Sequence, residues 1–311
     1  MKILFMGTPD FALFSLKALV DAGEDVVGVV TQPDKPKGRG YTLTPPPVKV
    51  YALEKEIPVY QPSTLKGEEF ASLLGTISPD IIVVVAYGKI LPENVISYPK
   101  HGCINVHGSL LPKYRGAAPM QRAIIDGEAV TGITTMYMDV GLDTGDMLDT
   151  VDIPIGIDDN FEDIHDRLGK AGAELLLVTI DKIKKGTQTR TPQNDEESTY
   201  AAKIEKADCL IDFGRPTVEI HNLIRGLSPI PLAITHTPDG KILKAVKSRI
   251  VSTDGKKGEP GVVLSLDSEI IVATGDGELA LCTVLPEGKG RMSAADYIRG
   301  RKISVGDILC N

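Results

Sequence analysis

The sequence predicts an α/β protein, with an N-terminal doubly wound, mostly parallel sheet and a small C-terminal β-barrel. Residues 2–6 form an apolar strand, helical spacing follows over 10–22, and residues 25–31 form a valine-rich strand, which together make a βαβ opening. Residues 80–86 are a nearly continuous β-branched run, as expected of a strand buried on both faces of a parallel sheet. After about residue 210 the chain changes to short strands separated by Gly and Pro, which is typical of a barrel.

Length and composition agree with two globular domains. The chain has 311 residues, of which 42% are hydrophobic and 24% charged. We predict a domain for the chemistry at 1–185, a polar linker at 186–206 and the barrel-like domain at 207–311. No apolar run approaches the ~18 residues of a membrane span, and the first residues lack the features of a signal peptide. A cytoplasmic protein is therefore expected.

The first turn after the opening strand argues against a dinucleotide site. Thr8 is expected to cap the first helix, with Pro9 in its first turn. Only Gly7 stands where a dinucleotide-binding fingerprint has three glycines. A helix start of this kind can hold an anion, but an NAD site is disfavoured.

Residues 32–50 are too long and too basic for a minimal connection. This segment contains Lys35, Lys37 and Arg39, with Gly38 and Gly40 between and after them, and three prolines follow at 45–47. Two interpretations stay open from composition: a solvated loop, or a mobile arm that contacts phosphate.

Further elements follow from periodicity. Strands are expected at 56–60, 101–107, 131–138 and 147–155, and helices at 67–75, 118–126, 161–185 and 215–225. The barrel strands are expected at 241–250, 261–266, 269–274 and 278–284.

The strand at 101–107 provides the candidate reactive groups. Side chains along a strand alternate, so Asn105 and His107 leave the same face near its carboxyl end, where α/β sheets bind ligands. A hydrogen-bond donor beside a titratable ring suits an acyl-type reaction at neutral pH. The residues after the buried strand, 87–92, are a second wall of this crevice.

Other kinds of site are disfavoured. His101, Cys103 and His107 have no nearby fourth metal ligand, and the four cysteines form no CxxC pair. Ser109 lacks the Gly-x-Ser-x-Gly elbow of a hydrolase nucleophile. The net charge is -8, with -9 in residues 1–202 and +1 in residues 203–311. It argues against non-specific coating of nucleic acid, although local basic patches could still bind a polyanion.

Two motifs resemble a known family. The run Asn-x-His-x-Ser-Leu-Leu-Pro-x-x-Arg-Gly at 105–116 is followed by Asp-x-Gly-x-Asp-Thr-Gly at 139–145. This pairing resembles the signature of the 10-formyltetrahydrofolate-dependent formyltransferases, and the resemblance extends over nearly the whole chain. The basic segment at 35–40, the Tyr-Ala-Ala-Lys-Ile run at 200–204 and the C-terminal domain are similar to the branch that formylates methionyl initiator tRNA.

The resemblance implies a formyltransferase-type Rossmann-like sheet, an OB-like barrel and a set of roles. Asn105, His107 and Asp143 match the family's catalytic positions, and 10-formyltetrahydrofolate would be the co-substrate, without a metal. The folate-binding positions implied are Ser109, Leu110, Leu111, Pro112, Tyr87, Gly88, Leu91 and Asp139. The tRNA-binding positions implied are Lys35, Lys37, Arg39 and Lys206. A monomer without membrane contact is expected. The chain has no Trp, and Phe213 and Ile230 stand where relatives often have one.

Two alternatives remain. A formyltransferase acting on an amino sugar or another small amine would share the three reactive positions but would not need the basic segment or the second domain. A non-catalytic RNA-binding protein would bind RNA without folate and would transfer no formyl group.

Overall fold

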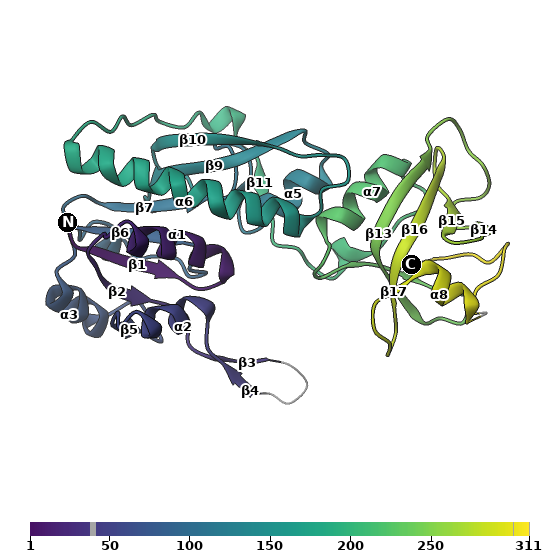
Figure 1. The fold of residues 1–311 in the computed structure, drawn as a ribbon. Helices are drawn as coiled ribbons and strands as arrows, with labels where there is room; N and C mark the ends of the chain where they lie inside the picture. The colour runs from purple at the N-terminus through teal and green to yellow at the C-terminus, as the bar shows by residue number, and fades with distance from the viewer. Residues whose placement is uncertain (38–41, 301, 311) are drawn as a thin grey trace. The chain divides into compact units, whose positions relative to one another are not determined.

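The structure is a computed structural model that describes residues 1–37, 42–300 and 302–310 (Figure 1). Its contacts divide the chain into two compact units, which are described separately. Unit 1 consists of Met1–Gly116, Thr131–Ile153 and His165–Tyr200, and unit 2 of Ala117–Val130, Pro154–Ile164 and Ala201–Asn311. No helix in the described part of the chain combines the length and apolarity needed to cross a bilayer.

Unit 1 is built on a seven-stranded sheet in the order β10-β9-β7-β6-β1-β2-β5. The strands are β1 (Ile3–Gly7), β2 (Val26–Val30), β5 (Val59–Tyr60), β6 (Ile81–Val85), β7 (Cys103–His107), β9 (Val130–Tyr137) and β10 (Met147–Pro154). The pairs from β5 to β7 are parallel, and β9 runs antiparallel to β7. All residues of β1 and β6 are buried, which explains why they are apolar throughout instead of alternating.

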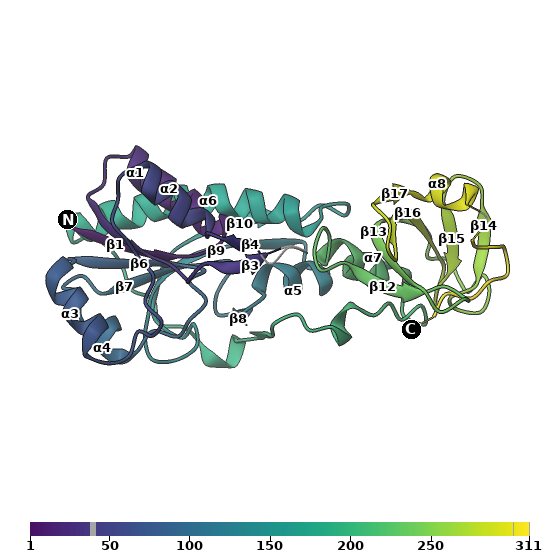
Figure 2. The same cartoon turned by 90° about the horizontal axis from the view of Figure 1, so that it is seen from below.

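Helices cover both faces of this sheet. Figure 2 shows α1 (Asp10–Asp21), α2 (Pro47–Glu54) and α6 (Phe161–Lys185) on one face, and α3 (Glu68–Ile77) and α4 (Glu93–Ile96) on the other. The doubly wound, mostly parallel fold predicted from the sequence is confirmed.

The predicted cap of the first helix was wrong. The first helix begins at Asp10 with Pro9 as its N-cap, and Thr8 does not cap it. The Thr8 hydroxyl instead donates to the carbonyl of Tyr87 at 3.0 Å, a contact between distant segments that local sequence does not encode.

The basic segment is also more ordered than a loop. It contains a hairpin of β3 (Lys35–Lys37) and β4 (Thr42–Thr44), and α2 begins at Pro47 because proline fits the first turn of a helix. Arg39 lies outside the described residues.

His165 links α1 to α6 in a way that makes stability depend on pH. Its ring lies 5.4 Å from that of Phe11, Nδ1 lies 2.9 Å from Asp166 Oδ1, and Nε2 lies 3.5 Å from Asp10 Oδ1. Asp10 raises the pKa of His165 and burial opposes this, while His165 lowers the pKa of Asp10. A raised folded-state pKa of a histidine stabilises the fold fully below the unfolded pKa, and this contribution is lost as pH rises through the folded value.

We therefore expect His165→Gln to destabilise the protein more in acid than in base. The extra loss in free energy of unfolding at about pH 5.5, compared with about pH 9, should be about 1 kcal/mol or less, because the pair is partly exposed. Denaturant unfolding at both values measures it. When Asp10 is already replaced by Asn, the loss of stability caused by His165→Gln should depend less on pH. An equal loss of unfolding free energy at both pH values in the single variant would contradict the proposed pH-dependent role of His165.

Unit 2 combines an antiparallel sheet with short helices. The sheet has the order β12-β13-β16-β15-β14, with β17 paired to β16. Its elements are α5 (Pro119–Ile125), α7 (Thr217–Gly226), β12 (Ala233–His236), β13 (Ile242–Ser252), β14 (Val263–Leu266), β15 (Ile270–Ala273), β16 (Glu278–Pro286), β17 (Met292–Ser293) and α8 (Ala294–Arg299). The strands β12 and β17 and the helix α8 were not predicted. Between the larger elements of the chain lie β8 (Arg115–Gly116), η1 (Asp195–Glu197), β11 (Tyr200–Ala201) and η2 (Ala207–Cys209).

The chain end closes this sheet. Cys310 pairs with His236 of β12, whereas Asp307 and Leu309 pair with Val263 and Gly261 at the opposite edge strand. Gly261 has φ +90°, and a Cβ there would lie 2.4 Å from the Leu309 carbonyl oxygen, so glycine is required for this approach. The predicted barrel-like closure thus depends on residues 306–310.

Phe213 and Ile230, which stand where relatives often have Trp, lie in different environments. Phe213 is buried in the core of unit 2, together with residues of α7 and of the barrel strands. Ile230 is 69% exposed. The core of this unit is therefore filled without an indole at either position.

Candidate active site

The predicted reactive groups lie on β7 in unit 1. Cys103, Asn105 and His107 share one face of the strand, and Cys103 belongs to the core cluster that includes Phe70 of α3 and Val95 of α4. Asn105 is half-buried, and its carboxamide makes no hydrogen bond to any described residue. It is therefore available to a ligand.

His107 is held in one orientation by a backbone contact. Its ring is buried, and Nε2 lies 2.9 Å from the carbonyl oxygen of Tyr114. A carbonyl can only accept, so Nε2 must bear a proton and donate it. Nδ1 is then the nitrogen that can gain or lose a proton, and it lies 3.8 Å from Asp143 Oδ2. That distance exceeds a hydrogen bond but allows strong electrostatic attraction.

Asp143 reaches His107 because its loop folds back along the sheet. Strand β9 runs antiparallel to β7, and its last residue, Tyr137, pairs with Ile104 near the amino end of β7. His107 lies three residues, or about 10 Å, nearer the carboxyl end of β7. The loop after β9 must therefore run back by this distance before Asp143 can reach His107. Asp143 adopts φ 53°, which Asp tolerates better than most residues, and its Oδ2 accepts from Gly116 N at 2.9 Å. At Gly145 a Cβ would lie 1.9 Å from the Tyr137 carbonyl oxygen, so glycine permits the return.

Two residues hold this loop: Gln193, which the sequence did not single out, and Arg115, the arginine of the run at 105–116. Gln193 donates from Nε2 to the carbonyl oxygens of Asp143 and Gly145, both at 2.8 Å. Arg115 donates to Gln193 Oε1 at 2.9 Å and pairs with Asp195 at 2.8 Å. A glutamine in a polar segment gives no sequence signal of such a role. The segment containing it, expected as a linker, makes these contacts within unit 1.

The turn after β7 is fixed by its own hydrogen bonds. The fully buried Ser109 donates from Oγ to the Lys113 carbonyl oxygen at 2.7 Å. Thr134 donates to the Ser109 carbonyl oxygen at 2.8 Å and accepts from Leu111 N at 3.1 Å. Leu111 is buried, and the bond from it to Pro112 is cis. The Ser109 hydroxyl therefore shapes the turn, and contact of Ser109, Leu110, Leu111 and Pro112 with folate stays a prediction.

The other predicted folate positions lie in two loops. Tyr87 and Leu91 are buried, Gly88 has φ +81°, and burial raises the pKa of Tyr87 to about 12. Asp139 accepts through Oδ1 from Gly141 N and from the Thr144 hydroxyl. Their role in binding folate also stays a prediction.

The same two loops, which were expected to form walls of the crevice, contain apolar side chains whose exposure the sequence did not predict. Ile90 is 88% exposed, Val140 73% and Leu142 52%. Large exposed apolar side chains beside polar groups are typical of ligand-binding surfaces. An ordinary apolar residue in a loop gives no signal of its exposure in sequence.

The predicted tRNA-binding residues are only partly described. Lys35 is exposed in unit 1, and Lys206 is exposed in unit 2. For Lys37 only the backbone, in β3, is described. Within the described ranges, no group of three or more His, Cys, Asp or Glu side chains could hold a metal ion.

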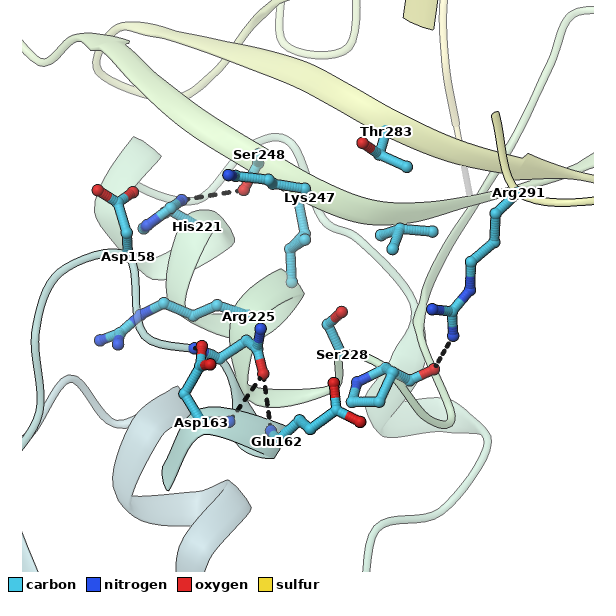
Figure 3. A pocket seen from close by; sticks show the side chains of 14 residues that line it. Asp158, Glu162, Asp163, His221, Arg225, Ser228, Lys247, Ser248, Thr283 and Arg291 are labelled. Carbon is cyan, nitrogen blue, oxygen red and sulfur yellow. Dashed lines mark hydrogen bonds between the residues drawn. The ribbon is translucent and has the colours of Figure 1, made fainter. Parts of the chain in front are cut away.

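Unit 2 contains a cavity of about 290 Å³ that the sequence did not predict (Figure 3). His221 of α7 lies in its wall, with Nε2 2.9 Å from the Ile157 carbonyl oxygen and Nδ1 2.9 Å from Ser248 Oγ. Burial lowers the pKa of His221, which favours the neutral ring. Arg225 donates to the carbonyl oxygens of Gly156 and Asp159, both at 3.0 Å. Both side chains therefore tie residues 156–159 to α7.

Side chains of both signs line this cavity. Asp158, Glu162 and Asp163 face it together with Lys247 and Arg291 (Figure 3). The carboxylates would repel a phosphate, so this lining does not match a polyanion.

Comparison with known proteins agrees with the motifs. Residues 1–180 match the formyl transferase family, and residues 203–302 match the formyl transferase C-terminal domain. The methionyl-tRNA formyltransferase of Geobacter metallireducens is 48% identical, over 98% of this chain and 97% of that protein. The methionyl-tRNA formyltransferase of Symbiobacterium thermophilum is 49% identical, over 98% of this chain and 94% of that protein.

Solved structures share the fold. The sugar 3N-formyl transferase WlaRD superposes with a TM-score of 0.68 at 21% identity, covering 93% of this chain and 99% of that chain. The N-formyltransferase of Helicobacter canadensis gives a TM-score of 0.67 at 23% identity, covering 90% of this chain and 98% of that chain.

Proposed function

Because the chain belongs to the formyl transferase family, we propose that it transfers a formyl group from 10-formyltetrahydrofolate to the α-amine of methionyl initiator tRNA. The observation that supports this substrate is the identity of about 48% to curated methionyl-tRNA formyltransferases over nearly the full length of both chains. The amino-sugar alternative is supported only by a likeness of fold at 21–23% identity. The half-buried, unpaired carboxamide of Asn105, on the same strand face as His107, suits the chemistry.

In the first step the neutral amine attacks the formyl carbon, and the carbonyl oxygen becomes an oxyanion. Asn105 donates a carboxamide N–H to this oxygen, an interaction worth about 2.7–4 kcal/mol for one donor in comparable sites. The unpaired carboxamide supports this role because it need not break an existing bond to do so.

In the second step the C–N10 bond breaks and the leaving nitrogen takes up a proton. The attacking nitrogen loses one proton, and the N10 of folate gains one, so the net charge is unchanged. His107 Nδ1 faces Asp143 at a distance that leaves this nitrogen without a hydrogen bond to the carboxylate, so it can exchange a proton with the reacting atoms. The Asp143 carboxylate, 3.8 Å from Nδ1, attracts the positive charge that the ring carries while it holds the proton.

The remaining assignments belong to the same proposal. Residues 1–185 form the catalytic domain, 186–206 the linker and 207–311 the tRNA-binding domain. Ser109–Pro112, Tyr87, Gly88, Leu91 and Asp139 surround the folate, and Lys35, Lys37, Arg39 and Lys206 contact the tRNA. The enzyme works as a cytoplasmic monomer in translation initiation.

The direct test is formyl transfer by the purified protein from 10-formyltetrahydrofolate to methionyl initiator tRNA, with methionyl elongator tRNA as the control. Formylation of the initiator alone is expected. Product from amino sugars, with none from either tRNA, would replace the proposed substrate. Folate-independent RNA binding without transfer would support a non-catalytic role.

Arg39→Ala is expected to raise the KM for methionyl-tRNA about tenfold, because one charge-assisted phosphate contact is lost. The KM for folate should change little. Steady-state kinetics with each substrate varied separately measures both. An unchanged KM for tRNA would remove Arg39 from the tRNA contacts.

A further inference from the structure

Three side chains form a closed cluster at the base of the β3–β4 hairpin. Lys49 of α2 donates from Nζ to both carboxylate oxygens of Asp34, at 2.9 and 2.8 Å, and to Gln61 Oε1 at 2.8 Å. Gln61 donates from Nε2 to Asp34 Oδ1 and to the Gln32 carbonyl oxygen, both at 2.8 Å. Each of the three side chains therefore contacts the other two.

The chemistry of the cluster fixes its arrangement. Lysine can only donate and an ionised carboxylate can only accept, so the Gln61 amide must turn its oxygen to Lys49 and its nitrogen to Asp34. Hydrogen bonds from Lys49 and then Gln61 lower the pKa of Asp34, and so favour its carboxylate form. The Lys49 and Asp34 side chains are 20% and 29% exposed, so the pair is partly shielded from water.

This cluster joins both ends of the hairpin to the sheet. Asp34 directly precedes β3, Lys49 follows β4 in the first turns of α2, and Gln61 directly follows β5. The hairpin itself has only three residue pairs, and Leu43 at its middle pair is 65% exposed. A short two-stranded hairpin has little stability of its own, so its direction must be set at its base.

We propose that Asp34, Lys49 and Gln61 are positioning residues, which fix the direction in which the β3–β4 hairpin leaves the sheet and thereby preorganise it for docking of the tRNA substrate. The inference rests on the proposed function. A hairpin whose base is already held loses less conformational entropy when the tRNA binds, so loosening the base weakens tRNA use without altering the chemical step.

Two variants test this proposal: Lys49→Met removes a positive charge, and Asp34→Asn removes a negative one. Lys49→Met and Asp34→Asn should each raise the KM for methionyl initiator tRNA about tenfold, equivalent to about 1.4 kcal/mol. The kcat at saturating tRNA and the KM for folate should stay within about twofold of wild type. If Lys49 instead contacted phosphate directly, Asp34→Asn would leave the KM for tRNA unchanged or lower it, because a negative charge is removed, and that result would overturn the proposal.

The matched control is Glu24→Gln. It breaks the Lys184–Glu24 ion pair, which lies in the same unit with side-chain exposures of 37% and 14%. This variant should leave both KM values unchanged. Lys49→Arg keeps a cation that can bind the Asp34 carboxylate through two N–H groups, and it should recover most of the tRNA affinity.

A measurement without substrate separates this inference from the proposed function. Hydrogen exchange of the backbone amides of residues 35, 37 and 42–44 should be several-fold faster in Lys49→Met and Asp34→Asn than in wild type. Unchanged exchange in both variants would overturn the positioning role. If wild type formylates no tRNA, the proposed function fails, and faster exchange would still support the role of the cluster in holding the hairpin.

Discussion

Asn105→Ala is expected to lower kcat for formyl transfer by about 10²–10³-fold, the usual cost of removing one donor to an oxyanion. The loss should fall on kcat more than on KM, because the donor acts on charge that develops in the transition state. Steady-state kinetics with 10-formyltetrahydrofolate and methionyl initiator tRNA measures it, beside thermal unfolding.

Cys103→Ala is the matched control for that variant. Cys103 lies two residues earlier on the same face of β7 and is buried in the core. Its replacement should lower the melting temperature and leave kcat within a few-fold of wild type. Near wild-type turnover in Asn105→Ala would remove the proposed oxyanion donor, whatever the control shows.

Asp143→Asn is expected to lower kcat by about 10²–10⁴-fold, the range of general acid–base contributions. Asparagine keeps the volume, tolerates the positive φ and can still accept from Gly116 N. What it removes is the negative charge that faces His107 Nδ1 at 3.8 Å. The fold should therefore stay intact, and the same kinetics with circular dichroism tests both statements.

Asp146→Asn controls for damage to the loop. Asp146 belongs to the same loop and pairs with Arg190 at 2.8 Å, away from His107 in its contacts. Its replacement should leave kcat within a few-fold of wild type. Equal losses in the two variants would mean that Asp143 acts through the shape of the loop and not through its charge.

Much of the fold could be predicted because its signals are local. The helix at 161–185 has the predicted bounds, since its apolar face repeats with helical period over seven turns. The β-branched run at 80–86 contains β6, Ile81–Val85. The common face of Asn105 and His107 follows from the two-residue period of a strand.

Other features could not be predicted, because they depend on segments far apart in sequence. Thr8 bonds to Tyr87 instead of capping its own helix, and Gln193 holds a loop fifty residues earlier. The strand β12 was missed because it is short, and its pairing with Cys310 comes from the chain end. A hydrogen bond between distant residues leaves no periodic pattern in either segment.

By itself, the sequence determined the class of the two domains, the chemistry available at the end of β7 and, through its motifs, the family. Periodicity and residue type are sufficient for these because each depends on neighbours along the chain. Only the tertiary structure decided which nitrogen of His107 is free, because that depends on the carbonyl of Tyr114. The tertiary structure also decided how Asp143 reaches His107. It likewise brought Asp34, Lys49 and Gln61 together. In both cases, burial and pairing between distant segments select one arrangement among the many that local sequence allows.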